Sequence, residues 1–157
     1  MSTPADHEER PEDRPHPSTE DRLGYLLKHA QLRFAELAAS ALAPYGIDGR
    51  EWAVLTSLDE RAPLSQREVA RRLEIDRTTM VALIDQLEGK GLVQRRQDPD
   101  DRRRNLVGLT DTGRDTLRRA APARDDAERR FLAPLPEDAA ERFKQALRTL
   151  VTATERR

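Results

Sequence analysis

Two predicted helices joined by a very short connection restrict the possible folds of this chain more than any other feature. Ser65 and Glu68 have the spacing of a capping box, in which a hydroxyl and a carboxylate each satisfy a free backbone N–H group. The stretch that follows has an apolar side made of Val69, Ala70 and Leu73. Asp76 then provides a second N-cap. Two helices joined by so tight a turn form a helix-turn-helix unit, whose second helix is the candidate for the major groove of DNA.

The second helix of this unit has one apolar and one polar face. Its apolar residues recur with helical spacing, and they predict a buried stripe of Met80, Leu83, Ile84 and Leu87. Burial of that stripe turns the opposite face outward, with Thr78, Val81, Ala82 and Asp85 on it. Asp85 would repel phosphate unless it meets a cytosine amino group or pairs with an arginine.

The start and the outward face of this helix carry groups that suit DNA. Arg77 can reach a guanine edge with two hydrogen bonds, and the hydroxyls of Thr78 and Thr79 can donate to phosphates or base edges. Val81 and Ala82 offer apolar contact to thymine methyl groups. For each of these side chains, an ordinary solvated helix face is the alternative interpretation.

Ser65 and Gln66 stand at the start of the preceding helix. In helix-turn-helix docking that helix crosses the DNA backbone. We therefore expect both residues to position the protein on phosphate groups, while Ser65 also serves as N-cap.

From Leu92 onward the pattern predicts a β-hairpin, with two short apolar strands joined by a charged loop at 98–101. Five arginines lie on or beside this loop, at Arg95, Arg96, Arg102, Arg103 and Arg104. Such a cluster on a hairpin suits a narrow, electronegative minor groove. Charge alone is a weak signal, because a basic loop is more often simply solvated.

Long amphipathic stretches flank this central part. Residues 18–45 predict a helix that begins after Ser18 or Thr19 and ends at Pro44. Residues 111–157 predict two more helices, the first of which Pro122 is expected to kink or interrupt. Residues 1–17 are acidic and contain four prolines, so we expect a disordered arm ahead of a single domain over residues 18–157.

Composition indicates an oligomer and excludes several kinds of site. Leu, Ile, Val and Phe make up only 32 of the 157 residues, and a core this thin is commonly completed by a second copy. The chain has no cysteine, which excludes disulfides, thiolate zinc sites and iron–sulfur clusters. His7, His16 and His29 have no ligand-like spacing, so we expect no metal site and no cofactor.

The sequence does not predict an enzyme or a membrane protein. It shows no nucleophile beside a base, no paired-carboxylate site and no phosphate-binding glycine loop, since Gly89 and Gly91 are better explained as helix-ending residues. No stretch is apolar enough to span a membrane, and the N-terminus lacks the apolar run of a signal peptide. The expected location is the cytoplasm.

The runs 76–80 (DRTTM), 87–93 (LEGKGLV), 98–103 (DPDDRR) and 109–110 (LT) together resemble the motifs of MarR-family regulators. The resemblance covers about residues 20–155. It implies a mainly α fold with a small β-hairpin wing, in which a winged helix-turn-helix is flanked by long N- and C-terminal dimerisation helices. Residues 18–45 and 111–157 would then form the dimer, and residues 46–110 the DNA-binding lobe.

The resemblance also implies a function. It predicts a transcriptional repressor that binds pseudo-palindromic operator DNA as a homodimer and is released by a small ligand. In the wing, Asp101 would orient the tip, and Arg102 or Arg103 would enter the minor groove.

The effectors of the family are small and often aromatic or phenolic, and they bind near the junction of the dimerisation helices and the DNA-binding lobe. Tyr25, His29, Arg33 and Trp52 can contribute to such a pocket. Trp52 also fits ordinary core packing, and His29 fits an exposed or hydrogen-bonded side chain. The absence of cysteine excludes sensing by cysteine oxidation.

A protein-interaction module is the alternative function. In it, the winged helix would use its hairpin and basic surface to contact a protein partner without reading DNA. Substitution of Arg77 and Thr78 would leave such partner binding unchanged.

Overall fold

A computed structural model describes residues 18–59, 63–101 and 105–154 of the chain. The elements in order are η2 (Thr19–Asp21), α1 (Leu23–Leu42), η3 (Ala43–Tyr45), α2 (Gly49–Asp59), β1 (Leu64–Ser65), α3 (Gln66–Arg72), α4 (Arg77–Gly89), β2 (Val93–Gln97), β3 (Asn105–Leu109), α5 (Asp111–Leu132) and α6 (Glu137–Thr154), where η marks a 3-10 helix. This mainly helical order with one small sheet confirms the predicted fold class. The arm predicted over residues 1–17 lies outside the described residues. None of the described helices is both long enough and apolar enough to cross a membrane.

The chain divides after Leu32 into two compact units. In the first unit, the Ser18 hydroxyl donates to the Asp21 carboxylate at 2.7 Å and makes no capping bond to the backbone. The short η2 precedes α1, which begins at Leu23, later than predicted. The other end of α1 lies in the second unit and is as predicted, because the helix stops at Leu42 and Pro44 lies in η3.

Side chains cap the three central helices, and the N-caps predicted at Ser65 and Asp76 are confirmed. Asp48 Oδ1 accepts two backbone N–H groups of the first turn of α2, at 2.8 and 2.9 Å. Ser65 and Glu68 form the reciprocal capping box of α3. Asp76 accepts the Thr79 N–H group at the start of α4 at 2.9 Å. Side chains close in sequence thus determine where α2, α3 and α4 begin.

The sheet has three antiparallel strands in the order β1-β3-β2. β2 and β3 form the predicted hairpin, with Val93 opposite Leu109. The extended piece before α3 is β1, and it pairs with the other edge of β3, with Leu64 opposite Val107. This second pairing, which the sequence did not predict, ties the start of α3 to the wing.

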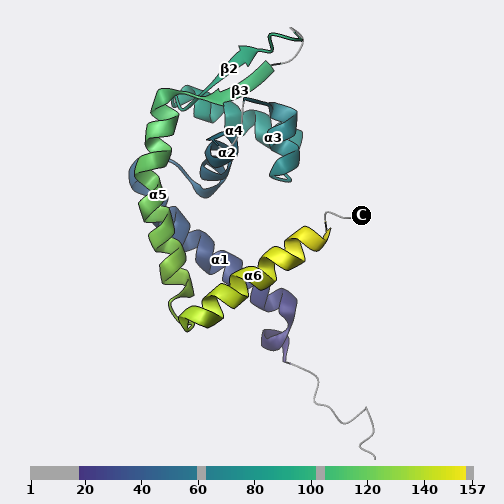
Figure 1. The fold of residues 1–157 in the computed structure, drawn as a ribbon, viewed down its shortest axis with the longest axis vertical. Coiled ribbons are helices and arrows are strands. Elements are labelled where there is room, and N and C mark those ends of the chain that lie inside the picture. The colour runs from purple at the N-terminus through teal and green to yellow at the C-terminus, as the bar shows by residue number, and fades with distance from the viewer. Residues whose placement is uncertain (1–17, 60–62, 102–104, 155–157) are drawn as a thin grey trace, which may run out of the picture. The chain divides into compact units, whose positions relative to one another are not determined.

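The core of the second unit lies among α2, α3, α4, the sheet and the first half of α5. α2, α3 and α4 lie together beside the sheet, and α5 leads away from it (Figure 1). The largest fully buried apolar side chains are Leu42, Leu55, Met80, Ile84, Leu87, Val54, Val69, Val93 and Val107. The whole stripe predicted for α4 is buried. The opposite face of α4 is therefore left for contacts outside the core.

α5 runs unbroken through Pro122, so of the two predicted effects, a kink or an interruption, the interruption is wrong. Pro122 is exposed, whereas Ala120 and Ala127 of the same helix are buried. The Arg118 carbonyl, which lacks its usual N–H partner four residues on, can bond to water on this side. The cost of the missing hydrogen bond is thereby limited.

α5 begins in direct backbone contact with the turn between α4 and β2. The Thr110 hydroxyl accepts the Gly113 N–H group at 3.0 Å and donates to the Gly91 carbonyl at 2.6 Å. The Thr110 N–H group donates to the Leu92 carbonyl at 3.1 Å. A Cβ atom at position 113 would lie 2.0 Å from that carbonyl oxygen, so only glycine fits there.

Replacement of this glycine should separate α5 from the turn. We expect Gly113→Ala to lower the free energy of unfolding by about 3 kcal/mol, because the backbone on both sides must shift to admit a methyl group. Urea unfolding followed by circular dichroism measures the loss. Gly89→Ala is the matched control, since a Cβ atom there meets nothing within 4 Å and alanine favours the helix by about 0.5 kcal/mol. Equal stability of the two variants would contradict the prediction.

An ion pair between a buried carboxylate and a partly exposed ammonium group joins the start of α2 to the end of α4. Glu51 exposes only 1% of its side chain, and its two carboxylate oxygens accept from Lys90 Nζ at 2.7 and 2.9 Å. The same ammonium group donates to the Gly46 carbonyl at 2.7 Å. Glu51 also accepts the Asp48 N–H group at 2.9 Å. These hydrogen bonds offset the cost of taking the Glu51 carboxylate out of water, and that cost returns if the partner is removed.

Removal of the ammonium group should therefore be costly. We expect Lys90→Met to destabilise the fold by about 3 kcal/mol, because it leaves the buried Glu51 carboxylate without its counter-charge. Thermal and urea unfolding measure the change. Lys144→Met serves as the control, since Lys144 pairs with Glu128 at the surface and its loss should matter much less. A Lys90→Met protein as stable as the control would show that this ion pair contributes little.

Candidate nucleic-acid interface

A groove of about 1080 Å³ lies where α3, α4 and β3 meet. Its lining consists of Ser65, Gln66, Arg67, Glu68, Ala70, Arg71, Arg77, Met80, Val81 and Asn105. Four residues predicted from the sequence to contact DNA, Ser65, Gln66, Arg77 and Val81, therefore lie around one groove. Sequence reasoning missed Arg67, Arg71 and Asn105, although the i, i+4 spacing of the two arginines on a short helix was a usable signal.

The outer face of α4 is exposed as the helical spacing predicts. Arg77, Thr78, Val81 and Ala82 are exposed, while the apolar stripe behind them is buried. Val81 lines the groove and exposes 39% of its surface, so an apolar side chain contacts solvent there. This combination of cationic, hydroxyl and apolar groups on one helix face suits the edges of base pairs.

The Thr79 side chain is used inside the protein. Its hydroxyl donates to Asp76 Oδ2 at 2.6 Å, and its N–H group donates to Asp76 Oδ1 at 2.9 Å. These two bonds hold the pKa of the Asp76 carboxyl below its ordinary value. The Thr79 hydroxyl, which was predicted to donate to DNA, already donates to the capping residue. Thr79 therefore stabilises the start of α4.

Ser65 and Gln66 differ in how far their polar atoms are satisfied. The Ser65 hydroxyl donates to Glu68 Oε2 at 2.5 Å and accepts the Glu68 N–H group at 3.3 Å. Gln66 Nε2 is buried and finds no hydrogen-bond partner in the described part of the chain. Gln66 lines the groove with other atoms of its side chain or backbone, while this amide nitrogen is enclosed by the protein.

Arg95 contacts α4, although it was predicted to contact DNA. Its Nη2 donates to Asp85 Oδ1 at 2.5 Å, its Nη1 donates to Glu88 Oε2, and its backbone N–H donates to Glu88 Oε1 at 3.2 Å. Partial burial by itself would lower the pKa of the Arg95 guanidinium, but the bonds to the two carboxylates outweigh it and raise the pKa. The alternative in which Asp85 pairs with an arginine is confirmed. Arg95 therefore neutralises two acids on the helix that bears the exposed face.

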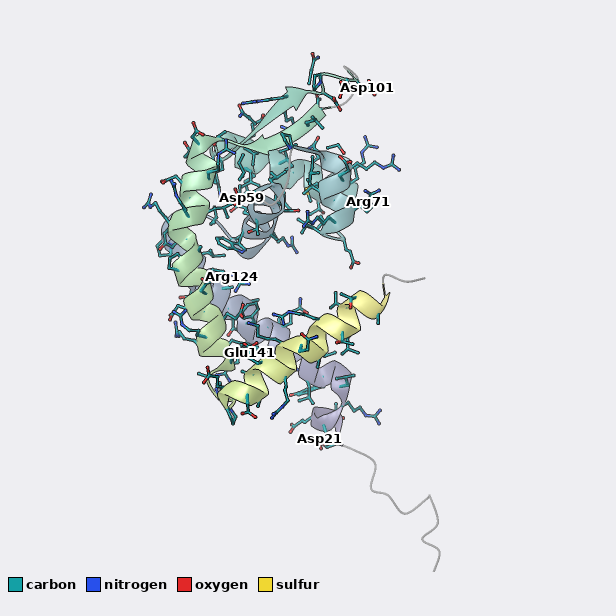
Figure 2. All side chains as sticks on the ribbon, viewed as in Figure 1. Asp21, Asp59, Arg71, Asp101, Arg124 and Glu141 are labelled. Atoms are coloured by element: carbon teal, nitrogen blue, oxygen red, sulfur yellow. The ribbon has the colours of Figure 1, made fainter. Side chains whose placement is uncertain are left out.

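The wing tip is described only in part. Asp101 is exposed at the loop end of the β2–β3 hairpin (Figure 2). Asp98 Oδ1 accepts the Asp100 N–H group at 2.9 Å and shapes the loop before it. Arg102 and Arg103, one of which was predicted to enter the minor groove, lie outside the described residues.

The residues predicted for an effector pocket fall in both units. In the first unit, the Tyr25 and His29 rings stack with centroids 3.9 Å apart, and His29 Nδ1 donates to the Tyr25 carbonyl at 2.9 Å. In the second unit, Arg33 is exposed, and Trp52 packs partly against the core. The interpretation of His29 as hydrogen-bonded and that of Trp52 as core packing are thus both confirmed.

Trp52 also lines an open pocket of about 440 Å³ between α2 and α5. The other lining residues are Thr56, Asp59, Arg114, Leu117, Arg118 and Ala121. Sequence reasoning did not find these partners, because those on α5 lie some sixty residues further along the chain. The pocket thus combines an indole ring, the Asp59 carboxylate and two guanidinium groups that pair with Asp111 and Asp115.

Arg95 can be tested as a link between the wing and α4. We expect Arg95→Met to lower the free energy of unfolding by about 1 kcal/mol, because two carboxylates lose their shared partner. In an Asp85→Asn, Glu88→Gln background the same change should cost much less, and urea unfolding of the four proteins gives the coupling. Arg96→Met, on the same strand, is the control. A loss that is equal in both backgrounds would show that Arg95 does not act through these acids.

Comparison with known proteins gives consistent matches. The MarR family model matches residues 48–104, which include the helix-turn-helix and the loop between the hairpin strands. A putative transcriptional regulatory protein for the hcr operon of Thauera aromatica is 31% identical over 123 residues, covering 78% of this chain and 74% of that protein.

Two solved structures are similar over most of the chain. The transcriptional repressor CouR bound to a 23-mer DNA duplex is 36% identical with a TM-score of 0.80, covering 88% of this chain and 99% of that one. CouR from Rhodococcus jostii RHA1 bound to p-coumaroyl-CoA is 31% identical with a TM-score of 0.75, covering 86% and 95%.

Proposed function

This chain belongs to the MarR family of transcriptional regulators, and on that premise we propose that it is a repressor that binds a pseudo-palindromic operator as a homodimer. The observation that carries the proposal is the groove between α3 and α4 with the exposed face of α4 beside it. Arg77 and Thr78 would read base edges, and Val81 and Ala82 would contact thymine methyl groups. Ser65 and Gln66 would hold phosphates. In this role the protein acts in the cytoplasm, where operator DNA is found.

The domain division follows the same proposal. Residues 46–110 would form the DNA-binding lobe, and residues 18–45 and 111–157 would form the dimer. Large apolar side chains are exposed on both flanking parts, at Leu23, Leu26, Leu27 and Leu32 in the first unit and at Leu135, Phe143, Leu150 and Val151 in the second. Apolar surface of this extent supports burial against a second copy. Two recognition helices on one duplex face set half-sites about 10 bp apart.

The wing would complete the contact with DNA. Asp101 would orient the tip, and Arg102 or Arg103 would enter the minor groove, where a narrow groove concentrates negative potential. Arg95 would contribute indirectly, because it removes the repulsion that Asp85 and Glu88 would exert on the nearby phosphates.

The pocket beside Trp52 is the proposed effector site in the second unit. An aromatic compound that carries a negative charge would stack on the indole ring and compete with Asp111 and Asp115 for the Arg114 and Arg118 guanidinium groups. The structure of CouR with p-coumaroyl-CoA, an aromatic acyl thioester, supports an effector of this class. Its binding between α2 and α5 would alter the DNA-binding lobe, because α5 is joined to the turn before the wing through Gly113.

A fluorescence-anisotropy titration tests the proposal. Duplexes that cover the DNA flanking its own gene are compared with scrambled duplexes at two salt concentrations. We expect one flanking duplex to bind with a Kd of about 10 nM at physiological salt and the scrambled one at least about 1000-fold more weakly. Aromatic acids and their thioesters are then added to look for release.

Variants separate the proposed repressor from the protein-interaction module. Arg77→Gln and Thr78→Val should each reduce the preference for operator DNA by about tenfold, at a cost of about 1 to 2 kcal/mol per lost base contact. Arg119→Gln, on α5 and outside the groove, should change nothing. Equal binding of all duplexes by the wild-type protein, or none at low salt, would favour the interaction module.

A further inference from the structure

We propose that Arg67 and Arg71 form a phosphate clamp on α3 that grips one strand of the operator backbone and sets affinity without reading sequence. The inference rests on the proposed function, which it deepens by assigning two residues that neither the sequence motifs nor the resemblance singled out. The recognised chemistry is the phosphodiester oxygen. Arg77, on the facing α4, lines the same groove and under the proposed function would read bases there.

Placement is the first argument for the clamp. Arg67 and Arg71 are four residues apart on α3, so their side chains leave the same face of the helix one above the other. Both are exposed and both line the groove that also contains Arg77 and Val81 of α4. Figure 2 marks Arg71 on α3. A duplex seated on α4 would therefore bring its backbone to this face, as the first helix of such a unit crosses the backbone.

Availability is the second argument. Arg67 and Arg71 make no hydrogen bond or ion pair with any part of the chain that the structure describes. Many arginines elsewhere are paired, among them Arg95 with two acids and Arg118 with Asp115 at 2.8 Å. Two exposed guanidinium groups without an internal partner beside one groove leave positive charge available for an external anion.

The one acid on α3 does not cancel this charge. The Glu68 carboxylate accepts the Ser65 N–H group at 2.8 Å and the Ser65 hydroxyl at 2.5 Å, so it is held at the start of the helix. The two planar guanidinium groups therefore keep their donors for the tetrahedral oxygens of phosphate.

The salt dependence of DNA binding tests the clamp. The probes are a duplex that the wild-type protein selects from a random pool and its scrambled version. The wild type is compared with Arg67→Gln, Arg71→Gln and the double variant. Each lost phosphate contact should reduce the magnitude of the slope of log K against log salt by about 0.9, and the double variant by about 1.8. Affinity should fall by about tenfold per residue and equally for both duplexes.

Three controls make the result specific. Arg72→Gln, on the same helix but outside the groove lining, should leave the slope unchanged. Arg67→Lys and Arg71→Lys keep the charge and should keep the slope. Arg77→Gln should reduce the preference for the selected duplex, whereas the clamp variants should not. Unchanged thermal unfolding of the glutamine variants confirms that they remain folded, because both side chains are exposed.

Each outcome decides the proposal. Unchanged slopes in the glutamine variants, with the wild-type protein still specific, would overturn the clamp and leave the repressor proposal intact. A loss of sequence preference in either variant would also overturn it, since the residue would then read bases. If the wild-type protein selects no duplex, both the proposed function and the clamp are wrong. The same arginines would then be expected to bind an acidic protein partner.

Discussion

The close approach of the Leu92 carbonyl to Gly113 is the constraint on which the rest of the second unit depends. The absence of a side chain at position 113 lets α5 start against the turn that ends α4. Thr110 strengthens this junction by bonding to both Gly91 and Leu92. The helix-turn-helix, the hairpin and α5 consequently share one small set of backbone contacts. A movement of α5 would therefore shift α4 and the hairpin together.

The charged residues of the second unit divide into two groups by their partners. Several acids are paired inside the fold, as in the buried Glu51 with Lys90 and the exposed α4 acids Asp85 and Glu88 with Arg95. Arg67 and Arg71, at the groove, are left without a partner in the described part of the chain. Internal pairing thus removes negative charge from the neighbourhood of α4 and leaves positive charge at its edge. Composition alone hides this, because the net charge of the chain is −1.

The parts of the structure that depend on local chemistry were predictable from the sequence. The caps at Asp48, Ser65 and Asp76 and the buried stripe of α4 follow from neighbours a few residues apart. The partner of Arg95 and the second pairing of β3 join residues that come together only in the folded chain. The interruption predicted at Pro122 is wrong because α5 places this proline on its solvent side, which the local sequence does not reveal. Which residues line the groove depends on how α3 is placed against α4. The spacing of residues within each helix does not determine that placement.

The chain has 25 arginines and only three lysines, and none of the three lysines lines the groove that α3 and α4 form. Arginine stays protonated at every pH a cell experiences, and lysine acetylation has no substrate on that surface. The positive charge of the groove is consequently fixed once the chain is made. A cell that needs to weaken this surface must change its geometry or change how many copies of the protein it holds.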